Sequence, residues 1–304
     1  MLITIVTYNP EEEQVIKNIR KIKEKDSRNY ILIIDNNSRK IPNSLTTIAD
    51  YFLKFDKNYG LGKAYNTGIK IAKDLGENYI MFLDQDTVIL DNFNLSKVVI
   101  EAEKLREYQH LKSSILSINI DNAVLIKKIK GTNFYLAKIV VNSGMIVDIE
   151  YAYKNPFMEN LFLDRLDFEY TYRAVKQGYF PLVYTEKMIS HSPGEGVLEY
   201  KRLCGKIIKF LKALHTKYSK SESNGKPGHD FYYSNFLRYY LMLRNDVYLF
   251  VRRRIYLDFW KTIIVDVLRL CEVLGYRNAI GLILRAIRYG LFGELERDNE
   301  YLFM

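Results

Sequence analysis

The chain has 304 residues, of which 48% are hydrophobic, so it can bury one substantial core and a smaller second one, which argues against a disordered protein. Its formal net charge is +9, and residues 201–304 carry 19 Lys and Arg against 10 Asp and Glu, so the whole excess lies in the last third. Cys204 and Cys271 form no Cys-x-x-Cys pair and no cluster with histidine, which argues against a disulfide framework or a zinc site.

The amino terminus and the longest apolar runs bear on where the protein acts. Residues 1–6 are mostly apolar but lack a basic leader and a cleavage site, so we expect a first strand there and not a signal peptide. No uninterrupted apolar run approaches the ~20 residues that cross a bilayer. We therefore expect a cytoplasmic protein whose basic last third meets nucleic acid, an anionic membrane surface or an acidic ligand.

The first predicted elements are a strand and a helix. Residues 2–6 form an apolar run of the kind found in strands buried on both faces of a parallel sheet. Thr7, Tyr8 and Asn9 close this strand, and we expect Asn9 to cap the helix that follows. The apolar residues of that helix recur at helical spacing: Val15, Ile16, Ile19 and Ile22.

The second predicted strand, residues 30–34, ends in a polar cluster that begins with Asp35. Polar residues just past the carboxyl end of a parallel strand lie where ligands bind in open α/β sheets, so Asp35 is a candidate acceptor for a base or ribose edge. A simple Asx turn explains the same cluster equally well.

A glycine-rich segment precedes the next predicted helix and runs Asn58-Tyr-Gly60-Leu-Gly62-Lys63-Ala-Tyr-Asn66-Thr-Gly68. Glycines before a helix let the backbone approach a ligand closely, and the helix amino terminus offers N–H groups to phosphate. The spacing matches neither a Walker A loop nor a dinucleotide fingerprint. We therefore interpret the segment as a nucleotide-binding candidate of another type.

Residues 79–83 form a third apolar strand, which ends in Asp84-Gln85-Asp86. Alternate side chains of an extended chain point to the same side, so both carboxylates face one spot at the carboxyl edge of the sheet. Two hard oxygen ligands at that spot suit Mg²⁺ or Mn²⁺ held together with nucleotide phosphates. The alternative is a polar turn that needs no metal, because Asp is common in turns.

Together, four segments resemble family 2 glycosyltransferases with the GT-A fold, and within that family the bacterial rhamnosyltransferases. They are Thr7-Tyr8-Asn9, Ile34-Asp35-Asn36-Asn37-Ser38, residues 58–68 and Leu83-Asp84-Gln85-Asp86, in the family's order and spacing. The resemblance implies an α/β fold of the doubly wound GT-A type, with a mostly parallel sheet, helices on both faces and a C-terminal helical subdomain. It also implies a set of nucleotide-sugar-binding residues: Thr7, Tyr8, Asn9, Asp35, Asn58, Gly60, Lys63, Asn66, Asp84 and Gln85.

Two later segments take their expected roles from the resemblance. Asn142-Ser143-Gly144 matches the family segment beneath the donor sugar, where Gly144 lets the backbone approach it, although a strand glycine at a bulge is the alternative. His191 falls where the family has a histidine after the last strand, so it would complete a metal site with Asp84 and Asp86. Imidazole binds Mn²⁺ acceptably and Mg²⁺ less readily, and a hydrogen-bonded structural histidine is the competing interpretation.

An inverting sugar transfer needs a carboxylate that deprotonates the acceptor hydroxyl. In the family this base lies six residues before a helical arginine, and counting back from Arg173 gives Asp167. The preceding position, often Glu in the family, is Leu166 here. Asp164 and Glu169 are then expected to orient the base or to bind the acceptor. For all three carboxylates, an acidic helix start stabilised by the helix dipole is the alternative.

The last third resembles the rhamnosyltransferase-like members at Arg238-Tyr239-Tyr240-x-x-x-Arg244-Asn245. A helix would bring Tyr240 and Arg244 onto one face. Arg244 is therefore a candidate partner for the donor phosphates or a brace for the base, and equally a residue that anchors its helix to the catalytic domain.

Two amphipathic helices are predicted beyond this motif, and the first is expected to end at Gly275. The first helix has Leu257, Trp260, Ile264, Val267, Leu268, Cys271 and Leu274 on one face and Asp258, Lys261, Asp266, Arg269 and Glu272 opposite. The second helix has Arg277, Gly281, Arg285 and Arg288 on one side and Leu282, Ile283, Ala286 and Ile287 on another. With Arg252-Arg253-Arg254 upstream, this basic region suits contact with an anionic leaflet, or else forms a helical subdomain whose arginines are merely solvated. We predict a catalytic domain of residues 1–205 and a basic, mainly helical subdomain of residues 206–304.

The resemblance, together with these observations, implies an inverting, metal-dependent glycosyltransferase that uses Mg²⁺ or Mn²⁺ at the inner face of the cell membrane. It would move a sugar, most specifically L-rhamnose from dTDP-rhamnose, to a lipid-linked or saccharide acceptor in cell-surface polysaccharide synthesis. Another donor, such as a UDP-linked hexose, is the main alternative. A sugar nucleotidyltransferase would need a glycine-rich loop directly after the first strand, which the sequence lacks. A nucleic-acid-binding protein is disfavoured because the 25 Tyr fall mostly in apolar periodic segments without an RNA-binding signature.

Overall fold

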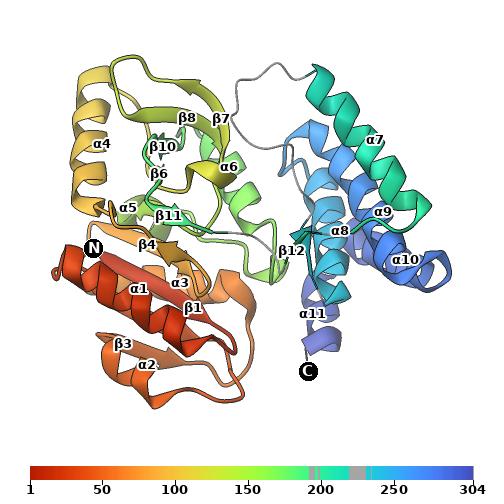
Figure 1. Cartoon of the computed structure of the whole chain (residues 1–304), viewed down its shortest axis with the longest axis horizontal. Coiled ribbons are helices and arrows are strands. Elements are labelled where there is room, and N and C mark those ends of the chain that lie inside the picture. The colour runs from red at the N-terminus through yellow and green to blue at the C-terminus, as the bar shows by residue number, and fades with distance from the viewer. Residues whose placement is uncertain (192–195, 198, 219–230, 234, 304) are drawn as a thin grey trace. The chain divides into compact units, whose positions relative to one another are not determined.

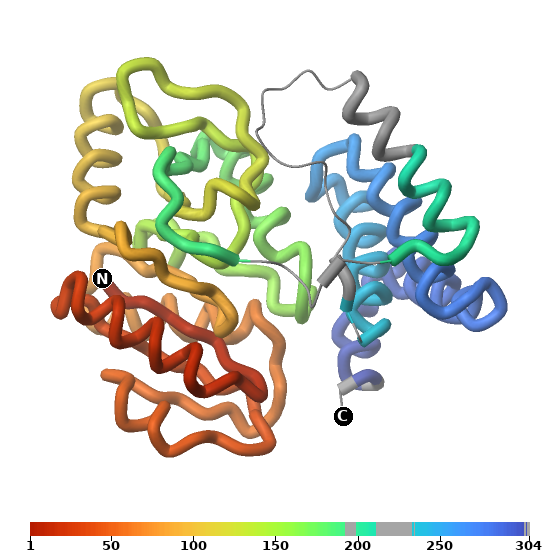
Figure 2. Tube along the Cα trace, viewed as in Figure 1, coloured from red at the N-terminus to blue at the C-terminus, as the bar shows by residue number. Residues whose placement is uncertain are grey.

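The computed structural model describes residues 1–191, 196–197, 199–218, 231–233 and 235–303. The chain forms two compact units. Unit 1 comprises Met1–Phe162 and Leu166–Ser192, and unit 2 comprises Leu163–Arg165 and Pro193–Met304. Figure 1 labels the helices and strands of both units, and Figure 2 traces the path of the chain through them.

Unit 1 is built on a nine-stranded sheet with the strand order β3-β2-β1-β4-β9-β6-β10-β8-β7. Its strands are β1 (Leu2–Thr7), β2 (Tyr30–Asp35), β3 (Tyr51–Lys54), β4 (Tyr79–Asp84), β6 (Ile115–Ser117), β7 (Val124–Lys128), β8 (Phe134–Ile139), β9 (Met145–Asp148) and β10 (Leu182–Tyr184). Four neighbouring pairs are parallel and four are antiparallel. Followed across the sheet, these pairings leave only β9 and β8 reversed against the other seven strands, which confirms the predicted mostly parallel sheet.

Helices cover both faces of this sheet, as predicted (Figure 1). They are α1 (Glu12–Lys25), α2 (Asn43–Ile48), α3 (Gly60–Asp74), α4 (Leu95–Gln109), α5 (Ile149–Lys154) and α6 (Leu166–Lys176), with short 3-10 turns at Ile120–Asn122 and Glu159–Leu161. Ile3 and Ile5 of β1 share one core with the apolar residues of α1 and α4. Thr4, which alternates with them, faces α3, because a methyl group added to Gly68 would lie 2.9 Å from its hydroxyl oxygen.

The first helix begins later than the sequence predicts, and Asn9 is not its cap. The N-cap of α1 is Glu11, whereas Asn9 has a left-handed backbone with φ 48. The amide oxygen of Asn9 accepts the N–H of Arg39 at 3.0 Å, and its own N–H donates to Ser38 at 2.7 Å. Asn9 therefore fastens the loop after β1 to the loop after β2. The sequence prediction missed this role because the partners lie some thirty residues away.

Unit 2 is mainly helical, as predicted. Its elements are β12 (Gly196–Val197), α7 (Leu203–Tyr218), β13 (Phe231–Tyr232), α8 (Phe236–Val251), a 3-10 turn at Leu257–Phe259, α9 (Trp260–Leu274), α10 (Tyr276–Phe292) and α11 (Leu295–Phe303). α8 packs against both α9 and α10 and is the central helix of the unit. The predicted stop of α9 is confirmed, because Gly275 caps it with φ 81.

α9 buries charged residues on the side opposite its apolar stripe. Asp266 is fully buried and Glu272 is 6% exposed, whereas Trp260 and Ile264 are 49% and 43% exposed. The carboxylate of Glu272 accepts the backbone N–H groups of residues 201, 202 and 205. None of the helices in the described part of the chain is both long and apolar enough to cross a bilayer.

Candidate functional site

The carboxyl ends of three neighbouring parallel strands bring the first predicted residues together. Thr7 of β1 is in register with Asp35 of β2, and Val6 is in register with Asp84 of β4. The hydroxyl of Thr7 donates to the carboxylate of Asp35 at 3.1 Å. Parallel pairing places these ends at one edge of the sheet, which is where ligands bind in this class of fold.

Asp84, Asp86 and His191 converge at this edge. One ligand atom from each lies within 4.8 Å of the others. In His191, Nε2 lies 3.5 Å from Asp84 Oδ2, and Nδ1 lies 3.4 Å from Asp86 Oδ1. The side chain of His191 is 11% exposed, that of Asp84 30% and that of Asp86 60%. Two carboxylates and one imidazole form a donor set that fits Mn²⁺, and also Mg²⁺ with water completing the shell.

A small two-stranded sheet brings His191 to the two aspartates across a long stretch of chain. β5 (Val88–Ile89) follows Asp86 by two residues and pairs antiparallel with β11 (Ile189–Ser190). Ser190 is in register with Val88, so His191 continues the strand to a position beside Thr87 and Asp86. The side chain amide of Asn122 donates to the carbonyl of His191 at 3.0 Å and holds that end of the strand.

Two buried hydroxyl groups support the three converging side chains. Thr87 and Ser143 are 0% and 1% exposed, and their hydroxyls form a hydrogen bond with each other. The hydroxyl of Ser143 also accepts the N–H of Asp84 at 3.3 Å, and that of Thr87 lies 3.5 Å from Nδ1 of His191. Sequence reasoning missed both residues, although each adjoins a motif residue. Such outer partners fix the orientation of ligating groups.

Tyr65 of α3 is a further residue that sequence reasoning missed. It is fully buried between Phe82 and Phe157, and its hydroxyl lies 3.3 Å from Asp84 Oδ1. Burial raises the pKa of Tyr65 well above its usual value, and the negative charges of Asp84 and Asp167 raise it further. Tyr65 is therefore a neutral donor to Asp84.

The loops that carry Asp35 and Gln85 are tied to the loop after β1. The carboxylate of Asp35 is 1% exposed and accepts the N–H of Ser38 at 2.8 Å and its hydroxyl, as well as the hydroxyl of Thr7. The Tyr8 backbone exchanges two hydrogen bonds with the Gln85 amide, at 2.8 Å and 3.3 Å. The side chain of Tyr8 is 49% exposed.

The glycine-rich segment forms the start of α3, and several of its groups are engaged within unit 1. Gly60 donates its N–H to the amide oxygen of Asn58 at 2.9 Å. Asn66 bonds both the N–H and the carbonyl of Phe157, at 2.8 Å and 3.0 Å. Lys63 lies 3.4 Å from the carboxylate of Glu159 on the molecular surface. The close approach permitted by Gly60 is to the chain itself, because an added methyl group would lie 2.4 Å from the carbonyl oxygen of Phe162.

Asp167 lies in the first turn of α6 and is partly exposed, and its Oδ1 accepts the N–H of Phe168 at 2.9 Å. Its charge acts on Tyr65, as do those of Asp84 and Asp86, so Asp167 shares one electrostatic environment with these two aspartates. Glu169 is 1% exposed and pairs with the guanidinium of Arg173 at 3.0 Å and 3.1 Å. Glu169 thus lies inside unit 1 in an ion pair along the helix.

Of three further predicted residues, one packs within unit 1 and two belong to unit 2. Gly144 has φ 86 and packs against β11, since an added methyl group would lie 2.6 Å from Ile189. Asp164 belongs to unit 2, where it pairs with Arg238 at 3.0 Å. Arg244 also belongs to unit 2, is 0% exposed and pairs with the equally buried Asp298 at 2.8 Å. The contacts of Arg244 are those of a residue that holds α8 to α11.

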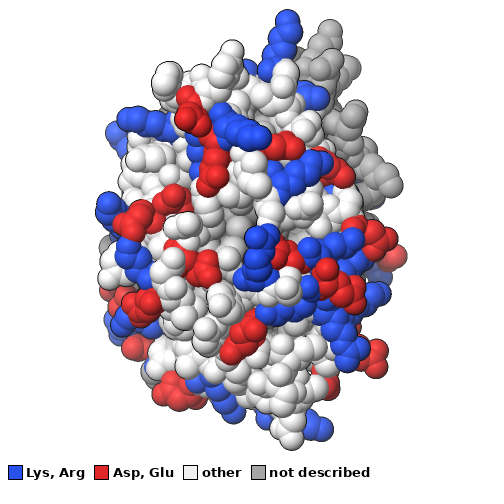
Figure 3. All heavy atoms as spheres, turned by 90° about the vertical axis from the view of Figure 1, so that its left-hand side faces the viewer, with Lys and Arg blue, Asp and Glu red and all other residues white. Residues whose placement is uncertain are grey.

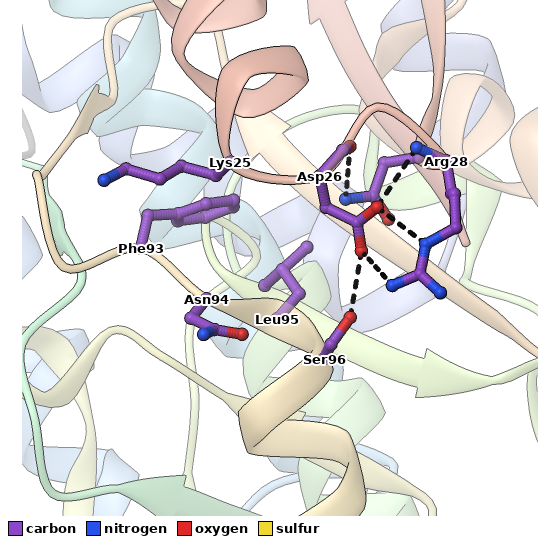
Figure 4. Close-up of a pocket in the computed structure, with 8 residues that line it drawn as sticks. Lys25, Asp26, Arg28, Phe93, Asn94, Leu95 and Ser96 are labelled. Atoms are coloured by element: carbon purple, nitrogen blue, oxygen red, sulfur yellow. Dashed lines mark hydrogen bonds and ion pairs between the residues drawn. The ribbon is translucent and has the colours of Figure 1, made fainter.

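A pocket of about 270 Å³ lies elsewhere in unit 1 (Figure 4). It is lined by residues at the end of α1 and the start of α4: Lys25, Asp26, Arg28, Asn29, Phe93, Asn94, Leu95 and Ser96. Asp26 accepts hydrogen bonds from Arg28 at 2.9 Å and from Ser96 at 3.0 Å, and the Arg28 guanidinium holds the pKa of Asp26 well below its ordinary value. This segment leads into the amino end of β2, so the pocket is not at the carboxyl edge of the sheet.

Comparison with known proteins relates the first part of the chain to one family. Residues 2–122 match the family model described as Glycosyl transferase family 2. The dTDP-rhamnosyl transferase RfbF of Shigella flexneri is 26% identical to this chain over 234 residues, which cover 70% of this chain and 75% of that protein.

Several solved structures resemble the chain at low identity. S. aureus TarS aligns with 96% of this chain at 16% identity and a TM-score of 0.47, and this chain spans 55% of the length of TarS. A mannosyltransferase from Pyrobaculum calidifontis, in complex with GDP-Man and Mn²⁺, aligns with 97% of this chain and 81% of its own at 13% identity and a TM-score of 0.48.

Proposed function

We propose that this chain, whose residues 2–122 match the Glycosyl transferase family 2 model, transfers a sugar with inversion from a nucleotide donor in a reaction that depends on Mn²⁺ or Mg²⁺. The observation that carries the proposal is the convergence of Asp84, Asp86 and His191 at the carboxyl edge of the sheet. The donor is most specifically dTDP-L-rhamnose, which is supported by the similarity to a protein named a dTDP-rhamnosyl transferase.

The nucleotide half of the donor binds along the ends of β1 and β2. A carboxylate accepts about four hydrogen bonds, and the carboxylate of Asp35 receives three from Thr7 and Ser38, which leaves one position for a ribose or base edge. Tyr8 and Asn9 contribute the loop above β1. Asn58, Lys63 and Asn66 are assigned to the same ligand from their place at the start of α3, and Gly60 supports this segment through its close contact with Phe162.

Asp84, Asp86 and His191 would hold the cation, and Tyr65, Thr87 and Ser143 would keep these ligands oriented. When bound, the cation neutralises the charge that builds on the diphosphate as it leaves the sugar. Gln85, fixed by the Tyr8 backbone, holds the loop after β1 close to these ligands.

Asp167 is the base. As the acceptor oxygen attacks the anomeric carbon, the new C–O bond forms on the face opposite the breaking C–O bond to the diphosphate, and the acceptor proton passes to the Asp167 carboxylate. Asp167 is partly exposed in the first turn of α6, so an acceptor hydroxyl can reach it. Gly144 and Glu169 support this site through packing and the ion pair with Arg173.

Thermal unfolding with nucleotides and metal tests the donor site. dTDP with Mn²⁺ should raise the melting temperature, corresponding to about 2.7 kcal/mol at a hundredfold excess over Kd, while either alone gives a smaller rise. Asp86→Asn should remove the metal-dependent part. Asp167→Asn should keep the shift but lower transfer by roughly 10²–10⁴-fold. A dTDP-induced rise in melting temperature that does not depend on Mn²⁺, or near wild-type turnover in Asp167→Asn, would refute these assignments.

The acceptor is lipid-linked or a saccharide of a cell-surface polysaccharide, and unit 2 meets the anionic inner face of the cell membrane. α10 exposes Ile280 and Leu284, which are 60% and 63% exposed, on the same face as Arg277 and Arg288 at spacings of three and four residues. An apolar stripe flanked by arginines complements an anionic leaflet. By contrast, basic and acidic side chains are intermixed on the face shown in Figure 3.

Vesicle flotation tests this surface. The chain should float with vesicles that contain phosphatidylglycerol and not with pure phosphatidylcholine, and the double variant Ile280→Asp, Leu284→Asp should lose binding. Ile126→Asp on β7 of unit 1, which replaces a residue 52% exposed, is the matched control and should bind normally. Concentration-dependent dimerisation that the double variant abolishes, without vesicle binding by the unmodified chain, would assign the face to a second copy instead.

A further inference from the structure

Three residues in the middle of the chain, Leu163–Arg165, belong to unit 2 although the segments before and after them belong to unit 1. The backbone here is unusual, because Asp164 and Arg165 have φ values of 60 and 66 and Phe162, just before the segment, has a φ of 64. A non-glycine residue with such a φ is strained and persists only where its surroundings over-determine it. Glycine would adopt this backbone without strain. Non-glycine residues at these positions therefore indicate that their side chains make contacts that the segment needs.

The side chain of Arg165 is held in a buried ionic cluster. It donates to Asp246 at 2.7 Å and 2.9 Å and to Asp266 at 3.1 Å. Arg165 is 8% exposed, and both aspartates are 0% exposed. Arg269 adds a second cation, 2.6 Å from Asp266. The fork of two parallel hydrogen bonds from Arg165 to Asp246 fixes the direction as well as the position of the guanidinium.

Helix α8, which carries Asp246, also binds the backbone of the Leu163–Arg165 segment. Asn245 of α8 donates its side-chain amide to the carbonyls of Leu163 at 2.8 Å and Asp164 at 3.2 Å. Arg238, two turns earlier on α8, bonds the carboxylate of Asp164 at 3.0–3.2 Å. Side chains and carbonyls of the segment are therefore both fixed, by residues that include Arg238 and Asn245 of the motif singled out in the sequence.

We propose that this clamp, formed by Arg238, Asn245 and Asp246 of α8 with Asp266 of α9, positions the catalytic base. The chain passes from Arg165 directly into Leu166, the first residue of α6, and Asp167 follows. Fixing the dihedral angles of Arg165 therefore fixes the backbone conformation immediately before the first turn of α6, which carries Asp167. Arg165 is a positioning residue that acts on Asp167 through the backbone, and this inference rests on the proposed role of Asp167 as base.

The test measures turnover and donor binding in Arg165→Met and Arg165→Lys. Arg165→Met should lower kcat at least tenfold, with the donor KM and the dTDP–Mn²⁺ thermal shift unchanged, because neither measurement depends on the base. Arg165→Lys keeps the charge but loses the fork, so its kcat should lie between Arg165→Met and the unmodified chain.

Glu272→Ala is the matched control for general damage to unit 2. Glu272 is a buried carboxylate of α9 whose described partners are backbone groups at the start of α7, not the Leu163–Arg165 segment. Equal losses of kcat in Glu272→Ala and Arg165→Met would overturn the inference, as would a loss of donor binding in Arg165→Met.

Asp167→Asn, measured in parallel, separates the two proposals. If Asp167→Asn is inactive while Arg165→Met turns over like the unmodified chain, only the positioning role fails. If Asp167→Asn retains turnover, the base is misassigned and the positioning inference falls with it.

Discussion

Replacing Gly60 by alanine tests why the glycine-rich segment contains glycine. Gly60 has φ 80, and an added methyl carbon would lie 2.4 Å from the carbonyl oxygen of Phe162 and 2.8–2.9 Å from two further backbone atoms. The adjacent Leu61 donates its N–H to the same oxygen at 2.7 Å, so the two chains cannot separate without losing that hydrogen bond. Gly60 is therefore required by a contact between two parts of unit 1.

The variant Gly76→Ala is the control that measures the cost of the left-handed backbone conformation alone. Gly76 has φ 72, and no atom of the described residues lies within 4 Å of an added methyl carbon. Gly76→Ala should cost only the left-handed conformation, about 1–2 kcal/mol. Gly60→Ala should cost that amount and a further ~1–3 kcal/mol, because overpacking against backbone is not relieved by a rotamer change.

Melting temperature is the readout. For a unit of the size of unit 1, 1 kcal/mol corresponds to roughly 2–4 °C, so Gly60→Ala should melt some 2–12 °C below Gly76→Ala. If the two variants melt together, the close approach at Phe162 does not exist in solution, and the glycine is free to serve a ligand as the sequence first indicated.

Two further predictions concern buried groups. Burial raises the pKa of Tyr151 to about 12 from 10, so the folded state favours the neutral phenol. This stabilising contribution, at most about 3 kcal/mol, is fully present below pH 10 and is lost as the pH rises to 12. Tyr151→Phe should accordingly flatten the decline of melting temperature between pH 9.5 and 11.5, and an unchanged slope would contradict it. Asp298→Ala should lower the stability of unit 2 by about 3–5 kcal/mol because it strands the buried guanidinium of Arg244, whereas Asp91→Ala, at an exposed pair with Lys21, should change stability far less. Chemical denaturation of both variants measures the contrast, and similar losses would refute it.

The parts of the fold that could be predicted are those that the residue pattern of a short segment determines. The strands β1, β2 and β4 are continuous apolar runs, and each ends where its first polar residues occur. The end of α9 is signalled by Gly275, whose φ of 81 few other residues adopt. Asp84 and Asp86 were recognised because a strand end and a one-residue spacing suffice to aim two carboxylates at one spot.

The missed parts depend on contacts between distant segments. Thr87 meets Ser143 across 56 residues, and no spacing in either segment indicates the pairing. No local pattern distinguishes Tyr65 from other aromatic residues, and only the packing of α3 on β4 places its hydroxyl beside Asp84. Arg165 was unremarkable in the sequence, because a positive φ at a non-glycine residue has no local signature.

The concentration of negative charge at the site explains why nucleotide binding there would need a cation. Asp35, Asp84, Asp86 and Asp167 lie at or near one edge of unit 1, and Tyr65 stays neutral among three of them. A nucleotide diphosphate is itself anionic, and like charges 4 Å apart repel by about 4 kcal/mol at an effective dielectric of 20. Residues 1–200 carry 26 basic and 26 acidic residues, so the net charge of this part of the chain offers no attraction that would offset the local repulsion.

Under the proposed function, dTDP affinity should therefore rise steeply with Mn²⁺. In Asp84→Asn, which removes one negative charge, affinity in the absence of metal should increase while the gain from Mn²⁺ falls. Calorimetric titration measures both affinities, and a decrease in metal-free affinity would show that repulsion by these carboxylates is not what the cation overcomes.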